Sequence, residues 1–216
     1  MAATSLSTRE IAAELAPFGV ELTAPALAQL STYLELLLRW NRRVNLTGLR
    51  QPRLIVRRLF GESLYLSRLV ELRGWLVDVG SGAGFPGLAL KLVAPDLRVT
   101  LIEARQRKGA FLKEVARACG FYAIDVVTER FEDWAERQAG GEKADCITTR
   151  AVRIDKKLLE RLGSLLAENG RAVLFTTSAC ARSIQAQVSG FVWQNPVFVP
   201  SVPNSVILVG CIHECK

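Results

Sequence analysis

The stretch that decides the fold is WLVDVGSGAGFPG, residues 75–87. It begins with a short run that is apolar apart from Asp78, which is typical of a buried strand. Four glycines then follow within eight residues. Glycine lets the backbone adopt positive φ and leaves room for a ligand to contact the main chain. We therefore predict a strand, a tight glycine turn that forms part of a ligand site, and a helix beginning near Pro86.

A second acidic residue indicates what kind of ligand this turn binds. Glu103 lies 23 residues after Gly80, at the end of the next predicted strand. A carboxylate at that position can accept hydrogen bonds from both hydroxyls of a ribose. The glycine turn between a strand and a helix, together with this acid, predicts an adenosine-containing cofactor.

Two cofactors fit the pattern. Residues 82–87 match G-x-G-x-x-G, the fingerprint of NAD binding, but Phe85 and Pro86 then stand where a helix would receive the pyrophosphate. The alternative register takes as the site Asp78, Gly80, Gly82 and Gly84. It puts the acid at the strand tip, where its carboxylate can meet the ammonium of a methionine moiety. S-adenosylmethionine has no phosphate that needs a helix N-terminus, so this register favours it over NAD.

From residue 75 onward, short β-rich runs alternate with helical stretches. The predicted strands cover residues 75–79, 99–102, 123–127, 145–148 and 172–175. The predicted helices begin near Pro86, Arg105, Phe131 and Asp155. This alternation predicts βαβ crossovers and therefore an α/β fold with a mostly parallel, doubly wound sheet. Residues 191–199 and 206–212 predict an antiparallel hairpin at the edge of that sheet.

The first part of the chain is helical in pattern. Ser7 and Glu10 match a capping box that opens a short helix, Thr23 caps a second helix, and Pro52 begins a third that runs to about Val70. We therefore predict two parts. Residues 1–73 form an N-terminal basic helical appendage packed on the core, and residues 74–216 form the cofactor-binding domain.

Positive charge is concentrated in the appendage. The chain has 28 Lys and Arg against 21 Asp and Glu, a net charge of +7, and residues 39–58 hold seven arginines and no acid. Such a run repels itself unless a polyanion approaches, and guanidinium groups bind phosphate well. We predict a nucleic-acid interface, with contacts from Arg39, Arg42, Arg43, Arg57, Arg58 and, at the end of a predicted strand, Arg150.

Composition also argues against several classes of protein. Half of the 216 residues are hydrophobic, enough to fill a core. We find no apolar run near the ~18 residues of a membrane span and no secretory signal, so we expect a cytoplasmic protein without membrane contact. His213 is the only histidine, so a hydrolase mechanism with a Ser-His-Asp or Cys-His arrangement would have to depend on this one residue. We predict no catalytic acid or base. Cys211, His213 and Cys215 lack a second ligand cluster, so we predict no metal site.

A set of short motifs resembles a known family. The motifs are Trp40-Asn41, Asn45-Leu46-Thr47, residues 78–87, Arg107-Lys108 with Phe111-Leu112, Arg130-Phe131-Glu132, and Arg150-Ala151-Val152. Through them the chain, from Trp40 to about Gly170, resembles the ribosomal RNA small subunit methyltransferase G family, also called glucose-inhibited division protein B. The glycine motif ending in Phe-Pro-Gly, joined to Trp-Asn and Asn-Leu-Thr, is specific to this family. Methyltransferases in general share only the glycines.

The resemblance implies a Rossmann-like class I methyltransferase that uses S-adenosylmethionine to methylate guanine N7 in 16S ribosomal RNA of the small subunit. It maps cofactor contacts onto Gly80, Phe85, Phe131, Glu132 and Arg150, and by analogy with the class it assigns the ribose to Glu103. Guanine N7 carries a free lone pair and the sulfonium is a strong electrophile. The reaction therefore needs positioning and no general base. We expect the enzyme to be a monomer.

Some positions depart from the family pattern. The family usually has Arg-His upstream of Asp-Ser, where this chain has Arg58-Leu59 upstream of Glu62-Ser63. A usual lysine is replaced by Thr176, and a usual arginine by a residue near Pro203. Because these positions tend to line the substrate side, a diverged, non-catalytic RNA-binding or assembly protein stays open as an alternative. A second alternative, an NAD-dependent oxidoreductase, stays open because residues 82–87 match G-x-G-x-x-G.

Overall fold

The structure is a computed structural model that describes residues 6–187 and 190–212. Strand β1, Trp75–Val79, lies in the middle of its sheet and is buried along its whole length, as expected of a strand covered on both faces. The strand order is β3-β2-β1-β4-β5-β8-β6, and β7 also pairs with β8. The other strands are Arg98–Ile102 (β2), Ile124–Val127 (β3), Ala144–Arg150 (β4), Leu166–Thr177 (β5), Val192–Trp193 (β6), Val197–Phe198 (β7) and Ser205–Cys211 (β8).

The sheet has the predicted topology. Strands β1 to β5 pair in parallel, and β8 pairs antiparallel with β5, β6 and β7. The strand order reverses between β1 and β4, because the chain first extends the sheet through β2 and β3 and then returns to the other side of β1. Ligands of open α/β sheets bind at such a switch point, beyond the carboxyl ends of the strands. The expected α/β class, mostly parallel and doubly wound with an antiparallel edge, is confirmed.

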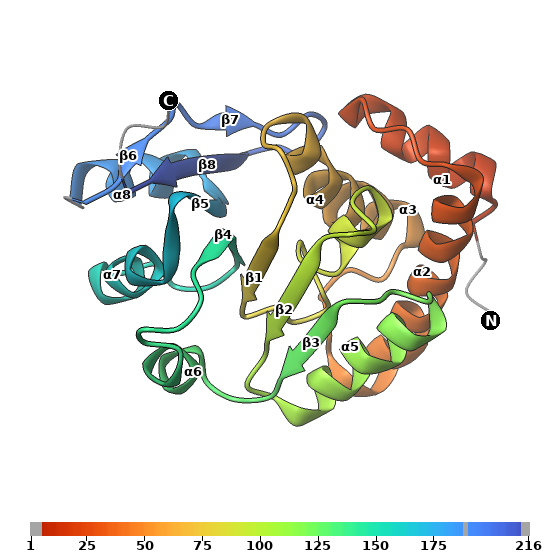
Figure 1. Cartoon of the computed structure of the whole chain (residues 1–216). Helices are drawn as coiled ribbons and strands as arrows, with labels where there is room; N and C mark the ends of the chain where they lie inside the picture. Colours follow the sequence, from red (N-terminus) through yellow and green to blue (C-terminus); the bar gives the residue numbers. More distant parts are fainter. Residues whose placement is uncertain (1–5, 188–189, 213–216) are drawn as a thin grey trace.

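Helices cover both faces of the sheet (Figure 1). On one face, α6 (Phe131–Arg137), α7 (Lys156–Leu165) and α8 (Ser178–Gln187) share a core with the strands. On the other face, α5 (Gln106–Ala118) packs together with the N-terminal helices. Asp155 caps α7 by accepting a hydrogen bond from the Leu158 N–H, in agreement with the predicted start of this helix.

The N-terminal region is a helical layer on that second face. It contains α1 (Thr8–Leu15), η1 (Ala16–Phe18) and α2 (Ala24–Val44), followed by a continuous helical run of α3 (Pro52–Ile55), η2 (Val56–Gly61), α4 (Glu62–Tyr65) and η3 (Leu66–Arg68). Ser7 forms the predicted capping box with Glu10, and Thr23 caps α2. The segment η2 is π-helical.

One sequence-based expectation about the elements differs from the structure. The helix predicted near Pro86 is absent. Turns occupy this stretch, and only a short 3-10 helix, η4 (Ala89–Leu92), follows them. The cause is the backbone of the turn, since Gly84 has a φ of +88° and the Gly87 N–H donates to a side chain rather than along a helix. The expected antiparallel edge is present: β8 pairs with β5 on one side and with the short strands β6 and β7 on the other.

The helical layer and the sheet share one hydrophobic core. Leu30 and Leu37 of α2 belong to the same buried cluster as Leu88, Leu90 and Phe111. The layer is therefore packed on the sheet through apolar side chains rather than attached by a tether. No helix in the described part of the chain is both long enough and apolar enough to cross a membrane.

Candidate functional site

The glycine turn lies at the carboxyl end of β1, beside the switch point. The Gly80 and Ser81 N–H groups both donate to the Ile102 carbonyl, at 2.9 and 3.0 Å, and tie the turn to the end of β2. The Gly84 N–H donates to the Ser81 carbonyl at 2.7 Å and closes the turn on itself. In the turn held by these bonds, Gly80 is exposed to solvent. Gly82, which we call the tip of the turn, is half-buried.

One peptide group of the turn has no protein partner. Among the described residues, neither the Gly82 carbonyl nor the Ala83 N–H is hydrogen-bonded, whereas the peptide groups on either side are held at one or both ends. A Cβ built on Gly82 meets only the Gly80 carbonyl, at 3.7 Å, so the space above it is open. The tip of the turn can therefore receive a ligand against its main chain.

The other glycines of the turn are needed for internal packing. A Cβ on Gly84 would collide with the Tyr33 hydroxyl, and one on Gly87 would lie 2.6 Å from the Asp78 Cβ. A Cβ on Gly80 would lie 2.7 Å from Val152, just after β4. Of the predicted glycine contacts, Gly82 has the open space that a ligand requires, while Gly84 faces the protein interior.

Asp78 supports the turn from inside. Its carboxylate is fully buried, accepts a hydrogen bond from the Thr148 hydroxyl at 2.7 Å, and accepts a second from the Gly87 N–H at 3.3 Å. Burial raises the pKa of Asp78 to about 6, against the hydrogen bonds that favour its charged form. The geometry gives this carboxylate a part in holding the turn and does not place it where it could meet a ligand's ammonium.

Glu103 stands at the end of β2, directly behind the open tip. Its Oε2 accepts from the Gly82 N–H at 3.0 Å, and its Oε1 accepts from the Arg105 N–H at 2.9 Å. A carboxylate has room for about four hydrogen bonds, so each oxygen keeps accepting capacity. Glu103 thus both holds the tip and offers an acceptor pair beside it.

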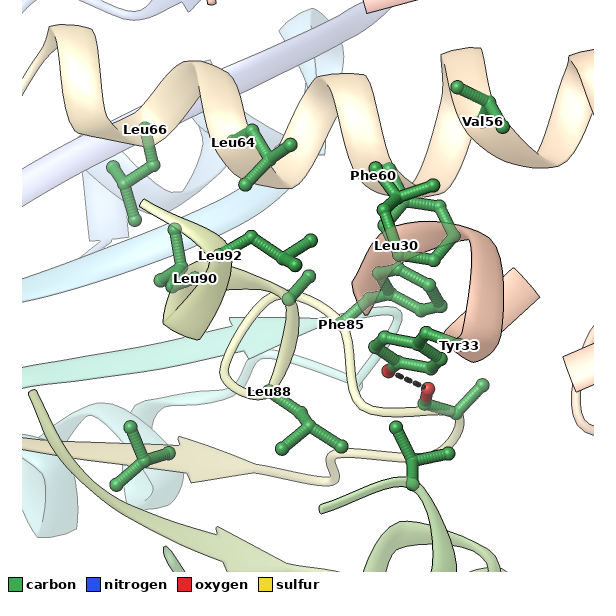
Figure 2. Close-up of a cluster of buried hydrophobic side chains, with 14 of the residues drawn as sticks. Leu30, Tyr33, Val56, Phe60, Leu64, Leu66, Phe85, Leu88, Leu90 and Leu92 are labelled. Carbon is green, nitrogen blue, oxygen red and sulfur yellow. Dashed lines mark hydrogen bonds between the residues drawn. The ribbon is translucent and has the colours of Figure 1, made fainter. Parts of the chain in front are cut away.

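Phe85 points away from the tip, into the helical layer (Figure 2). Its ring stacks on Tyr33 at 5.5 Å and meets the edge of Phe60 at 4.8 Å, and only 5% of the residue is exposed. At the end of β3, Phe131 is likewise buried and stacks on Trp134, whereas Glu132 is exposed in the first turn of α6. Of the predicted aromatic contacts, both rings serve the core, and Glu132 is free to meet a ligand.

Arg150, at the end of β4, forms a buried ion pair. Its Nη2 pairs with Glu62 of α4 and also donates to the Arg58 carbonyl at 2.8 Å, while Ser205 donates to the other oxygen of Glu62. Burial lowers the pKa of Arg150, and Glu62 opposes that shift. Within the described residues its Nη1 is buried without a partner. Arg150 therefore joins the helical layer to the switch point, a role that spacing alone did not indicate.

Part of the arginine run is neutralised by acids from other elements. Arg53 and Arg57 both pair with Glu14 of α1, which is only 7% exposed, and Arg53 also reaches Glu10. Arg39 pairs with Glu114 of α5 at 2.6 Å. The expectation that the run carries no counter-charge is therefore wrong for these three residues, because the acids come from helices distant in sequence.

The remaining arginines face solvent. Arg42, Arg43 and Arg58 are exposed and form no ion pair in the part of the chain that the structure describes. Helix α2 runs antiparallel to α5, since the Gln29 side chain reaches the Cys119 carbonyl and the Trp40 ring lies 5.8 Å from the ring of Phe111.

This pairing brings the end of α2 beside the start of α5. Three further cations lie there, next to Glu103: Arg105, Arg107 and Lys108. Sequence reasoning did not assign them to the interface, although Arg107 and Lys108 were among the family motifs. A basic surface thus borders the mouth of the site.

Of the positions around the departures from the family pattern, Arg58 and Glu62 contact Arg150. Thr176 of β5 pairs with Val206 of β8, and Pro203 is exposed just before that strand. No cluster of three or more metal-ligating side chains occurs among the described residues. His213 and Cys215, part of the trio considered for a metal, lie outside the described residues.

Solved structures share this fold. A crystal structure of MtNAS in complex with MTA and tNA superposes with a TM-score of 0.60 at 14% identity, covering 97% of this chain and 90% of that one. A precorrin-6y C5,15-methyltransferase from Geobacter metallireducens gives 0.51 at 14% identity, covering 69% and 86%. The sheet order, the glycine turn at the switch point and these neighbours define a Rossmann-like fold.

Sequence comparison gives the family. Residues 26–202 match the family "rRNA small subunit methyltransferase G". A ribosomal RNA small subunit methyltransferase G from Chloroflexus aggregans is 35% identical over 201 residues, 89% of this chain and 84% of that protein. Another, from Halorhodospira halophila, is 41% identical over 151 residues, 70% and 69% of the two chains. The chain belongs to this family, which confirms the resemblance and the methyltransferase interpretation over an oxidoreductase.

Proposed function

We propose that this protein transfers a methyl group from S-adenosylmethionine to guanine N7 in 16S ribosomal RNA of the small subunit. The proposed reaction rests on membership of the family, and one structural observation supports the glycine turn as the place where the cofactor binds. The Gly82–Ala83 peptide group, which has no hydrogen-bond partner among the described residues, lies beside the open space at Gly82 and next to the Glu103 carboxylate. A ligand there gains main-chain and carboxylate hydrogen bonds that the protein itself leaves unused.

The residues at the mouth fit the proposed cofactor. Glu103 would accept hydrogen bonds from the ribose, Gly80 and Gly82 would let the ligand approach the main chain, and Glu132 would face it from the end of β3. Phe85, Phe131 and Gly84 would act by shaping the turn and the core beneath it. NAD fits less well, because no regular helix begins at this turn to receive a pyrophosphate.

The reaction mainly requires that the methyl donor and guanine N7 are held in the correct relative position. When bound, S-adenosylmethionine supplies a methyl group on a positively charged sulfur, which is electrophilic without activation by the protein. Guanine N7 is unprotonated at neutral pH, so no side chain has to remove a proton. Holding the two reactants in line can contribute about 7–11 kcal/mol. We therefore assign no catalytic acid or base and expect Arg150 and Arg58 to orient the RNA beside the switch point.

The proposed RNA surface runs from the end of α2 to the start of α5. Arg42 and Arg43 would bind phosphates together with Arg105 and Arg107, and Arg58 would extend the surface toward Arg150. Arg39 and Arg57, both engaged in ion pairs, would contribute less. We propose that the enzyme acts as a monomer in the cytoplasm. There, residues 1–73 would present most of the RNA surface, and residues 74–216 would bind the cofactor and complete that surface at the start of α5.

Transfer of a tritiated methyl group to small ribosomal subunits lacking 7-methylguanosine tests the function directly. We expect label in 7-methylguanosine at one site, found by nucleoside analysis of the RNA. If S-adenosylhomocysteine binds and no label is transferred, the enzymatic proposal fails in favour of a non-catalytic RNA-binding or assembly protein. Thermal stabilisation by NAD and not by S-adenosylhomocysteine would contradict the proposed cofactor.

A further inference from the structure

Tyr33 of α2 connects the helical layer to the glycine turn. Its ring is completely buried, stacked on Phe85 and meeting the edge of Phe60 at 5.0 Å. Its hydroxyl donates to the Ala83 carbonyl at 2.6 Å, the dashed line in Figure 2. A hydroxyl buried among apolar side chains is costly unless it is bonded, and here its acceptor is the main chain of the turn.

This hydrogen bond fixes the peptide group next to the open tip. The Ala83–Gly84 peptide is held at both ends, because the Gly84 N–H donates to the Ser81 carbonyl at 2.7 Å while the Ala83 carbonyl accepts from Tyr33. The neighbouring Gly82–Ala83 peptide has no hydrogen-bond partner in the part of the chain that the structure describes. Fixing one peptide plane restricts the orientation of the next, so the Tyr33 hydroxyl limits how the Ala83 N–H is presented.

We propose that Tyr33 is a positioning residue for the methyl donor site: its hydroxyl holds the glycine turn in the shape that binds the cofactor. The proposal rests on the proposed function for the identity of the ligand. Tyr33 itself lies behind the turn, and we give it no contact with the cofactor or with RNA. Phenylalanine would fill the same core volume, so the effect of the hydroxyl can be separated from that of the ring.

The first experiment compares Tyr33→Phe with the wild type at a temperature where both are folded. We expect the dissociation constant of S-adenosylhomocysteine, measured by calorimetry, to rise about tenfold, because the turn then spends most of its time in other shapes. Hydrogen exchange of the peptide covering residues 80–87 should become faster. Thr100→Val is the matched control, since it removes a buried hydroxyl that accepts from the Trp75 indole at 3.0 Å, away from the turn.

A merely structural role would lower the melting temperature of both variants and leave both dissociation constants unchanged. The proposal would be overturned if Tyr33→Phe had a dissociation constant for S-adenosylhomocysteine within twofold of the wild type and unchanged hydrogen exchange in residues 80–87. If the wild type itself does not bind S-adenosylhomocysteine, the proposed function fails. The exchange measurement then decides the role of Tyr33 alone.

A second variant approaches the same contact from the turn. Gly84→Ala places a Cβ against the Tyr33 hydroxyl and should also weaken ligand binding. In the Tyr33→Phe background the hydroxyl is gone, so the same alanine should cost less, and the two effects should not add. Additive effects on the dissociation constant would mean that the contact between Tyr33 and the turn does not set the affinity.

Discussion

Replacement of Gly82 should damage ligand binding, and its positive φ adds a backbone strain that a control glycine with a similar φ can match. We expect Gly82→Val to abolish S-adenosylhomocysteine binding, because its side chain enters the open space above the tip. Gly120→Val is the matched control. Gly120 has a similar φ of +66° and also faces open space, but it lies at the end of α5. Calorimetry should show lost affinity in the first variant only, and retained binding in Gly82→Val would refute the placement of the ligand.

Asp78 makes stability depend on pH in a predictable direction. Its folded-state pKa, about 6, is above the value of 3.8 for an unfolded chain, so folding favours the protonated form. The stability that this group contributes is fully present below pH 3.8 and is lost as the pH rises to about 6. The shift corresponds to about 3 kcal/mol.

Comparison with Asp78→Asn isolates this effect from other titrating groups. From pH 4 to pH 7, the free energy of unfolding of the wild type should fall by about 2 kcal/mol relative to that of the variant, because part of the total change occurs below pH 4. Urea titrations at several pH values would measure it. A difference between the two proteins that does not change with pH would mean that Asp78 titrates normally.

The Glu62–Arg150 pair should matter more for stability than any surface pair. Glu62→Gln leaves a buried guanidinium without its counter-charge, and we expect a loss of about 3 kcal/mol or more in the free energy of unfolding. Glu142→Gln breaks the exposed pair with Arg98 and should cause no measurable loss. Equal effects of the two substitutions in denaturant titrations would argue against a buried ion pair.

At the scale of the element, helix α2 carries at its exposed end two of the arginines that we propose to bind RNA, Arg42 and Arg43. Replacing Arg42 and Arg43 with Ala should lower RNA affinity and reduce the slope of log K against log salt by about one to two units. Arg53→Ala is the control, because Arg53 is already paired with Glu10 and Glu14. Filter binding over a salt series would show the difference. Equal slopes in all three proteins would place the RNA elsewhere.

Sequence patterns predicted elements well where neighbouring residues decide them. The strand Trp75–Val79 and the caps at Ser7, Thr23 and Asp155 depend on local spacing and are found as expected. The prediction of a helix near Pro86 was wrong, because positive φ angles and a hydrogen bond to Asp78 hold that segment in turns.

In the candidate site, too, the features that depend on local spacing were predicted and those that depend on tertiary packing were not. Glu103 and Gly82 could be located from spacing along the chain, and they meet at the predicted edge. The partners of Arg57 and Arg150 could not, because Glu14 and Glu62 are brought to them by tertiary packing. The inward direction of the Phe85 ring also depends on tertiary packing, because the rings that surround it come from other elements.

The shared core makes a prediction for the whole molecule. Because the helical layer and the sheet bury one continuous apolar cluster, we expect a single cooperative thermal transition rather than two. A chain lacking residues 1–73 would expose Leu88, Leu90 and Phe111 and should aggregate. Calorimetry of the full chain tests this. Two separate transitions would show that residues 1–73 and 74–216 fold as independent domains.

The single helix that carries Tyr33 and Arg42 also fixes a length. Nine residues separate them, which at ~1.5 Å of rise per residue is about 14 Å along the axis. One end of that length is anchored at the glycine turn by the Tyr33 hydroxyl, and the other faces solvent. Helix α2 thus sets a fixed distance between the glycine turn and its exposed end, and an RNA bound there, as we propose, would present to the turn a nucleotide about that distance away from its grip.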